Sequence, residues 1–145
     1  MRKLVYVVAI DGSEWSDRAA DRAIDLAKKT EAEVHFVTAV QWSKYQPLYV
    51  ADFSAPPQDT TEQEKLERKS LLEPLENRYS DSGVETKSFI FWGHPADIIK
   101  EQANKVHANM IFVGRRGRSK VADLLLGSVA NSLAHTAGVP VVLVP

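Results

Sequence analysis

The sequence holds 145 residues, of which 44% are hydrophobic and 26% are charged. This length predicts a single domain over residues 1–145, and the composition excludes an intrinsically disordered chain. The 18 Lys and Arg residues nearly balance the 19 Asp and Glu residues, so the net charge of −1 favours neither nucleic acid nor an anionic membrane as a partner. Because cysteine is absent, disulfide bonds, thiolate metal sites and cysteine nucleophiles are excluded.

The first apolar run, from Leu4 to Ile10, is at the lower length limit of a secretory signal. No small-residue cleavage pattern separates it from the Asp11-Gly12 turn, so we interpret it as a buried strand. No stretch of the sequence approaches the ~18 apolar residues that span a bilayer. The lack of cysteine also favours a reducing compartment, and we therefore expect a cytoplasmic protein.

Apolar, β-branched runs alternate with segments of helical spacing along the whole chain. Strands are predicted at residues 4–10, 34–40, 84–92, 110–113 and 139–144. Apolar residues recur at helical spacing at Ala19, Ala23 and Ala27, at Ile99, Ala103 and Val106, and at Val129, Leu133 and Ala137. This alternation predicts an α/β fold with a parallel sheet and helices on both of its faces.

Local signals refine the helices. Pro95 suits the first turn of the segment that contains Ile99, and Ser128 is expected to be the N-cap of the last helix. A further charged helix is predicted at residues 62–79, where Pro74 should kink or interrupt it. The connection from Gln41 to Asp59 is longer than a crossover needs; it is either a lid or partner-binding loop, or a surface loop held by its own aromatic residues.

The most informative spacing is G-x2-G-x9-G-S, which follows the fourth strand as Gly114, Gly117 and Gly127-Ser128. Glycine lets the backbone approach a ligand closely, and a helix that opens at Ser128 offers free N–H groups to an anion. Turn chemistry alone explains isolated glycines, so the full spacing is what favours a phosphate site. Neither a Walker A loop nor a dinucleotide G-x-G-x-x-G is present. Basic residues accompany the glycines at Arg115, Arg116, Arg118 and Lys120.

With these glycines, the chain resembles the single-domain, ATP-binding universal stress proteins. Residues 7–14 resemble that family's first strand and acidic turn, and residues 137–144 resemble its last helix-to-strand corner. The resemblance covers the whole chain except 41–59. It implies a three-layer α/β/α, Rossmann-like fold of the adenine nucleotide alpha hydrolase type, with five parallel strands in the order 3-2-1-4-5. It also implies ATP, with Mg²⁺ accompanying the nucleotide, between the carboxyl ends of strands one and four.

Ten residues are expected in this site by their position in the resemblance. They are Ala9, Ile10 and Asp11 on one wall, Val40 against the adenine, Gly114 and Gly117 near ribose and phosphates, and Gly127, Ser128, Val129 and Ala130 with N–H groups for the phosphates. Asp11 is open to a second interpretation as an Asx-turn residue. The sequence departs from the family at Ala130, where some relatives have a hydroxyl residue, and at Asn109, where an Asp is usual and a capping role is expected.

No catalytic or metal-binding residue is assigned. The histidines His35, His94, His107 and His135 lack metal-ligand spacing, and Ser128 has no histidine base in a recognisable motif. The predicted function is that of a nucleotide-dependent regulatory or stress-response protein with at most weak ATP hydrolysis. The alternative is a slow ATPase or adenylyl-transferring enzyme, whereas a flavin site is disfavoured because its phosphate loop is missing. A homodimer is expected through the uncharged edge strand from Val139 to Val144.

Overall fold

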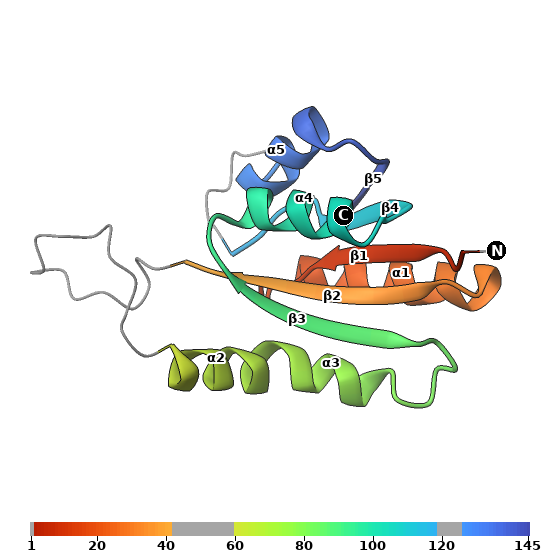
Figure 1. Cartoon of the computed structure of the whole chain (residues 1–145), viewed down its shortest axis with the longest axis horizontal. Helices are drawn as coiled ribbons and strands as arrows, with labels where there is room; N and C mark the ends of the chain where they lie inside the picture. The colour runs from red at the N-terminus through yellow and green to blue at the C-terminus, as the bar shows by residue number, and fades with distance from the viewer. Residues whose placement is uncertain (1, 42–59, 119–125) are drawn as a thin grey trace, which may run out of the picture.

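A computed structural model describes residues 2–41, 60–118 and 126–145. Five parallel strands form one sheet in the order β3-β2-β1-β4-β5 (Figure 1). They are β1 (Val5–Ala9), β2 (Glu33–Val40), β3 (Thr86–Trp92), β4 (Met110–Gly114) and β5 (Val141–Val144). The parallel sheet and its strand order confirm the fold expected from the sequence. Outward crossovers on both sides of β1 and β4 leave a crevice at the carboxyl ends of these two strands.

Helices cover both faces of the sheet (Figure 1). Helix α1 (Glu14–Thr30) packs on the face that carries Tyr6 and Val8, together with the helical segment that precedes β3. Helices α4 (Pro95–Lys105) and α5 (Ser128–Thr136) cover the opposite face, which carries Val7. The dense apolar runs of β1 and β4 follow from this arrangement, because both sides of these strands are buried.

The helix predicted at residues 62–79 is continuous, and it widens where Pro74 disturbs it. It consists of α2 (Thr61–Glu67), the π-helical turn η2 (Arg68–Leu72) and α3 (Glu73–Arg78). Proline lacks an N–H and its ring clashes with the carbonyl one turn earlier. The chain accommodates it through the wider turn, in which the N–H of Glu73 donates to the carbonyl of Arg68, five residues back. Pro74 therefore changes the helical turn without ending the helix.

Two local expectations are corrected. Ser128 is the first residue of α5 and Gly127 is its N-cap, since Gly127 has the extended backbone (φ −66°, ψ 161°) that an N-cap adopts. The last strand is also shorter than the apolar run, because Pro140 has no N–H and contributes only its carbonyl, which accepts from Ile111 N at 2.9 Å. Pro95 begins α4 as predicted.

Two other expectations fall outside the described residues. They are the connection from Gln41 to Asp59, of which only Gln41 is described, and Lys120 of the basic cluster. Among the helices of residues 2–41, 60–118 and 126–145, none is long and apolar enough to cross a membrane.

Candidate functional site

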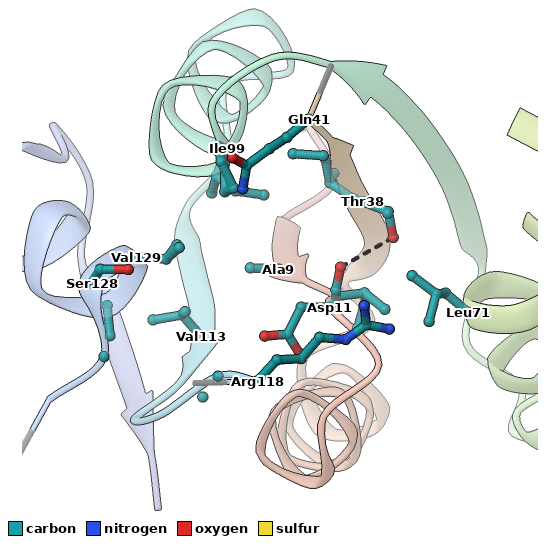
Figure 2. A pocket seen from close by; sticks show the side chains of 18 of the residues that line it. Ala9, Asp11, Thr38, Gln41, Leu71, Ile99, Val113, Arg118, Ser128 and Val129 are labelled. Carbon is teal, nitrogen blue, oxygen red and sulfur yellow. Dashed lines mark hydrogen bonds between the residues drawn. The ribbon is translucent and has the colours of Figure 1, made fainter. Parts of the chain in front are cut away.

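A cavity of about 480 Å³ opens at the carboxyl ends of β1, β2 and β4 (Figure 2). This size is in the range of small-molecule binding sites. All of the residues expected in the site line this one cavity: Ala9, Ile10, Asp11, Val40, Gly114, Gly117, Gly127, Ser128, Val129 and Ala130. Segments separated by more than a hundred residues in the sequence therefore meet at the place that the crossover geometry selects.

Asp11 has a structural role in the turn between β1 and α1. Its Oδ1 accepts from the N–H of Ser13 at 2.9 Å, and Ser13 Oγ in turn accepts from the N–H of Ser16 at 3.1 Å as the N-cap of α1. The Asx-turn interpretation is thus confirmed. The carboxylate also lines the cavity, and its Oδ2 lies only 2.8 Å from where a Cβ on Gly117 would stand. A ligand-facing role for Asp11 stays a prediction that is compatible with the turn.

Close packing around the cavity accounts for two glycines. Gly12 has φ +83°, and a Cβ there would lie 2.6 Å from Leu71 Cδ2. A Cβ on Gly114 would lie 2.6 Å from Trp15 Cβ and 2.8 Å from the Trp15 carbonyl carbon. Gly114 is therefore needed where β4 touches the first turn of α1, in addition to lining the cavity.

The amino end of α5 forms one side of the cavity, and its geometry suits an anion. The N–H of Gly127 is already used, because it donates to the carbonyl of Arg115 at 2.8 Å. Helix geometry leaves the N–H groups of Ser128, Val129 and Ala130 without intrahelical acceptors, at the positive end of the helix dipole. These three N–H groups are therefore the backbone hydrogen-bond donors that this end of the cavity can offer to a phosphate.

Arg116 adds a cation to the same cavity. Its Nε is buried, and among the residues that the structure describes no hydrogen-bond acceptor reaches it. A buried guanidinium N–H without a partner is costly, and an anionic ligand would satisfy it. Arg118 also lines the cavity, and its guanidinium lies close to Gly12 and Leu71 (Figure 2).

Sequence reasoning missed the wall opposite α5. Glu67 and Leu71 line the cavity from the helical segment at residues 61–78, and Thr38 lines it from β2, where its hydroxyl donates to the carbonyl of Ile10 at 3.1 Å. On the α5 face of the sheet, Pro95 and Ile99 also line the cavity, from α4. No motif marks Glu67, Leu71 or Thr38; the one available signal was Pro74, which follows the π turn that begins directly after Glu67.

Several polar residues singled out in the sequence lie away from the cavity. Asn109 Oδ1 accepts from the N–H of Val5 at 2.9 Å, which confirms the expected capping role. His94 is exposed at the N-cap of α4, outside the cavity lining. Buried His35 bonds through Nε2 to Glu33 at 2.7 Å, at the start of β2. Across residues 2–41, 60–118 and 126–145, no group of three or more His, Asp or Glu side chains is arranged to hold a metal ion.

The family model described as the universal stress protein family matches residues 5–145. The chain belongs to the universal stress protein family. It is 28% identical to the universal stress protein YxiE of Bacillus subtilis, over 95% of this chain and 96% of that protein. The structure superposes on the universal stress protein UspA from Lactobacillus plantarum with a TM-score of 0.78 at 19% identity, covering 100% and 99% of the two chains.

A third comparison concerns a family member that was solved with a ligand. This universal stress protein in complex with cAMP is 26% identical, with a TM-score of 0.68, over 99% of this chain and 98% of that one. The family membership and the shared fold account for the strand order that the sequence resemblance implied.

Proposed function

We propose that this chain binds ATP in the cavity at the carboxyl ends of β1 and β4, with Mg²⁺ accompanying the nucleotide. We further propose that it acts as a regulatory or stress-response protein whose nucleotide occupancy changes its assembly or its choice of partner. The observation that carries the proposal is the convergence of all ten expected residues on a single cavity with a helix N-terminus at one side. The universal stress protein solved with cAMP adds support, since its ligand is also an adenine nucleotide.

The residues present suit a phosphate-bearing ligand. The first turn of α5 offers N–H groups, and Arg116 brings a buried N–H that lacks an acceptor among the described residues. Val40 and Ile99 supply apolar surface for a base. Magnesium would be held mainly by the phosphates and water, as is usual for this ion with nucleotides.

Calorimetric titration of the purified chain tests the proposal directly. Mg-ATP should give saturable binding to one site per chain, and cAMP and AMP serve as comparison ligands because they contain the same base with fewer phosphates. Wild-type protein that binds none of these nucleotides in the presence of Mg²⁺ would refute the proposal.

The competing function is a slow ATPase or an adenylyl-transferring enzyme. Hydrolysis needs a positioned base or a lysine on the transferred phosphate, and the sequence has no Walker A lysine. We therefore expect turnover far below the ~1–100 s⁻¹ of kinases. Release of phosphate from ATP at such a rate by the purified chain would favour the enzyme.

We also propose that two copies associate through the edge strand β5. The strand is at one edge of the sheet, so one row of its backbone groups lacks a strand neighbour within the subunit. A groove of about 350 Å³ lies beside it, between β5 and the α1 residues Arg22, Leu26 and Lys29. Leu143 on this strand is 39% exposed, so the edge offers a second copy both apolar surface and unpaired backbone.

Leu143→Lys should shift the chain from dimer to monomer. Leu143 is a better test position than Val142, because the partly buried side chain of Val142 packs against the core beside α1 and a charge there would also lower stability. Leu4→Lys is the matched control, because Leu4 is similarly exposed, at 37%, but lies before β1 in the middle of the sheet. Sedimentation at tens of micromolar should show a wild-type dimer, a Leu4→Lys dimer and a Leu143→Lys monomer. A wild-type monomer would refute the dimer.

A further inference from the structure

The cavity and the edge strand β5 meet at residues 114–116. Gly114 and Arg116 line the cavity, and the sheet register aligns Gly114 with Val144 of β5. Between them, the N–H of Arg115 donates to the carbonyl of Val144 at 2.7 Å, and the carbonyl of Arg115 accepts from the N–H of Gly127 at 2.8 Å. The backbone of one residue therefore connects the edge strand to the N-cap of α5.

A second connection runs through the first turns of α1. Trp15 packs tightly on Gly114, since a Cβ on this glycine would lie 2.6 Å from Trp15 Cβ. The guanidinium of Arg18 lies over the Trp15 ring, 5.5 Å from its centroid, and Arg18 Nε donates to the carbonyl of Pro145 at 3.1 Å. Arg18 therefore ties the residue that follows β5 to the part of α1 that contacts the cavity loop.

Arg18 itself belongs to neither surface. It lines neither the cavity nor the groove beside β5, whereas Val144 and Pro145 both line that groove. The Arg18 side chain is 45% exposed, so its removal should leave the hydrophobic core intact. Coupling between two sites is carried by contiguous packed side chains and hydrogen bonds, and the contacts from Gly114 through Trp15 and Arg18 to Pro145 form such a connection.

We propose that Arg18 is a positioning residue that couples the cavity to the edge strand, so that ATP binding and association of two copies strengthen each other. The assignment rests on the proposed nucleotide function and on the proposed dimer. A nucleotide held beside Gly114 and Arg116 orders residues 114–116 and, through Arg115 and Arg18, the end of β5. An edge strand that is already ordered loses less conformational entropy when a second copy pairs with it. By linkage, association raises ATP affinity by the same factor.

The first test measures this linkage in the full chain. Sedimentation gives the dissociation constant of the dimer with and without saturating Mg-ATP, and Mg-ATP should strengthen the wild-type dimer at least about fivefold, the lower end of usual coupling. Calorimetry should show the reciprocal effect: the Leu143→Lys monomer should bind ATP at least about fivefold more weakly than the wild-type dimer. A direct loss is not expected at this position, because Leu143 does not line the cavity.

The second test removes the connection at Arg18. In Arg18→Ala, which lacks both the contact with Trp15 and the donor to Pro145, Mg-ATP should change the dimer dissociation constant by no more than about twofold. Added to Leu143→Lys, the same substitution should leave the ATP affinity of the monomer unchanged, because Arg18 lies outside the cavity. Lys28→Ala is the matched control and should keep the full effect of Mg-ATP, since it removes a positive charge from an exposed position of α1 that lines neither surface.

The outcomes separate this assignment from the proposed function. Wild-type protein that binds no ATP would refute the nucleotide function and the coupling together, and a wild-type monomer with and without ATP would refute the dimer and the coupling. ATP binding by a dimer whose dissociation constant is unchanged or raised by ATP would refute the coupling alone.

Two further results would refute the assignment to Arg18. One is an Arg18→Ala protein that keeps the wild-type effect of ATP on the dimer. The other is a loss of ATP affinity when Arg18→Ala is added to the Leu143→Lys monomer, which would show that Arg18 supports the cavity directly. If thermal melting shows that Arg18→Ala does not fold, Arg18→Met takes its place, because it keeps an aliphatic stem on the helix and removes the charge and the donor; the same loss of coupling is expected, and a retained effect would overturn the assignment.

Discussion

The two ends of the parallel sheet use their polar groups in different ways. At the amino ends of the strands, charged side chains pair with one another: Glu33 contacts Lys87 at 2.8 Å and His35 at 2.7 Å, and Lys3 contacts Glu85 at 2.9 Å. At the carboxyl ends, Glu67, Arg116 and the first turn of α5 instead face a cavity. The amino end therefore stabilises the fold, and the carboxyl end forms the candidate site.

The glycines beside the cavity are also more tightly surrounded than those away from it. A Cβ on Gly12, Gly114 or Gly117 would come within 2.8 Å of another residue, whereas a Cβ on Gly83 or Gly138, which lie away from the cavity, meets nothing within 4 Å. The crowded glycines differ in the neighbour that they meet. Gly114 faces the backbone of Trp15, and Gly117 faces only the end of the Asp11 side chain. We expect the first substitution to affect stability and the second to affect binding.

The largest effect is expected from Gly114→Ala. The new Cβ would stand 2.6 Å from Trp15 Cβ and 2.8 Å from its carbonyl carbon, so the strand or α1 must shift. Overpacking of this kind costs about 3 kcal/mol, or roughly 10 °C in Tm for a chain of this length. Thermal melting measures the change, with Gly138→Ala as the control because its Cβ meets open space. A melting temperature equal to that of the control would contradict the packing explanation.

Gly117→Val should lower ATP affinity at least tenfold, or about 1.4 kcal/mol, with a smaller loss of stability. Its Cβ would lie 2.8 Å from Asp11 Oδ2, and the branched side chain would enter the cavity that Gly117 lines. Calorimetry with Mg-ATP measures the loss, and Gly138→Val is the control. Unchanged ATP affinity in a folded Gly117→Val protein would show that the nucleotide does not approach this glycine.

The sequence predicted the fold well because the fold depends on repeated patterns. The apolar runs of β1 and β4 mark strands buried on both faces, and Pro95 marks the start of α4. The strand order came from the family resemblance, since alternation of strands and helices is compatible with several parallel orders. The prediction that Ser128 is the N-cap of α5 was wrong by one residue. Both serine and glycine are accepted at an N-cap, so the sequence Gly127-Ser128 does not say which of the two occupies that position.

The candidate site was predictable except for the wall formed by the helical segment at residues 61–78. The α5 side follows from the spacing of Gly114, Gly117 and Gly127, which is recorded in the sequence itself. The opposite side depends on Glu67, one of several acidic residues in a charged helix, and nothing in its neighbours marks it as buried. Its burial depends on the turn of helix that faces the sheet, which is a property of tertiary packing and of the π turn before Pro74.

The smallest effect is expected at the amino ends of the strands. There, Glu33→Gln removes the negative charge of a carboxylate that contacts both Lys87 and His35. The hydrogen bond from Lys87, supported by that from His35, holds the pKa of Glu33 below its ordinary value of 4.5, and the side chain is only 12% exposed. A lowered carboxyl pKa contributes stability above pH 4.5 that is lost as the pH falls through the folded-state pKa.

Urea unfolding should therefore show that Glu33→Gln lowers the free energy of unfolding by about 1 kcal/mol at pH 7. This loss should shrink below pH 4.5, and ATP affinity should be unchanged. Glu85→Gln is the control, because its ion pair with Lys3 is about half exposed and should contribute little. A Glu33→Gln protein with weakened ATP binding at pH 7 would show that the two ends of the sheet are coupled and not separate.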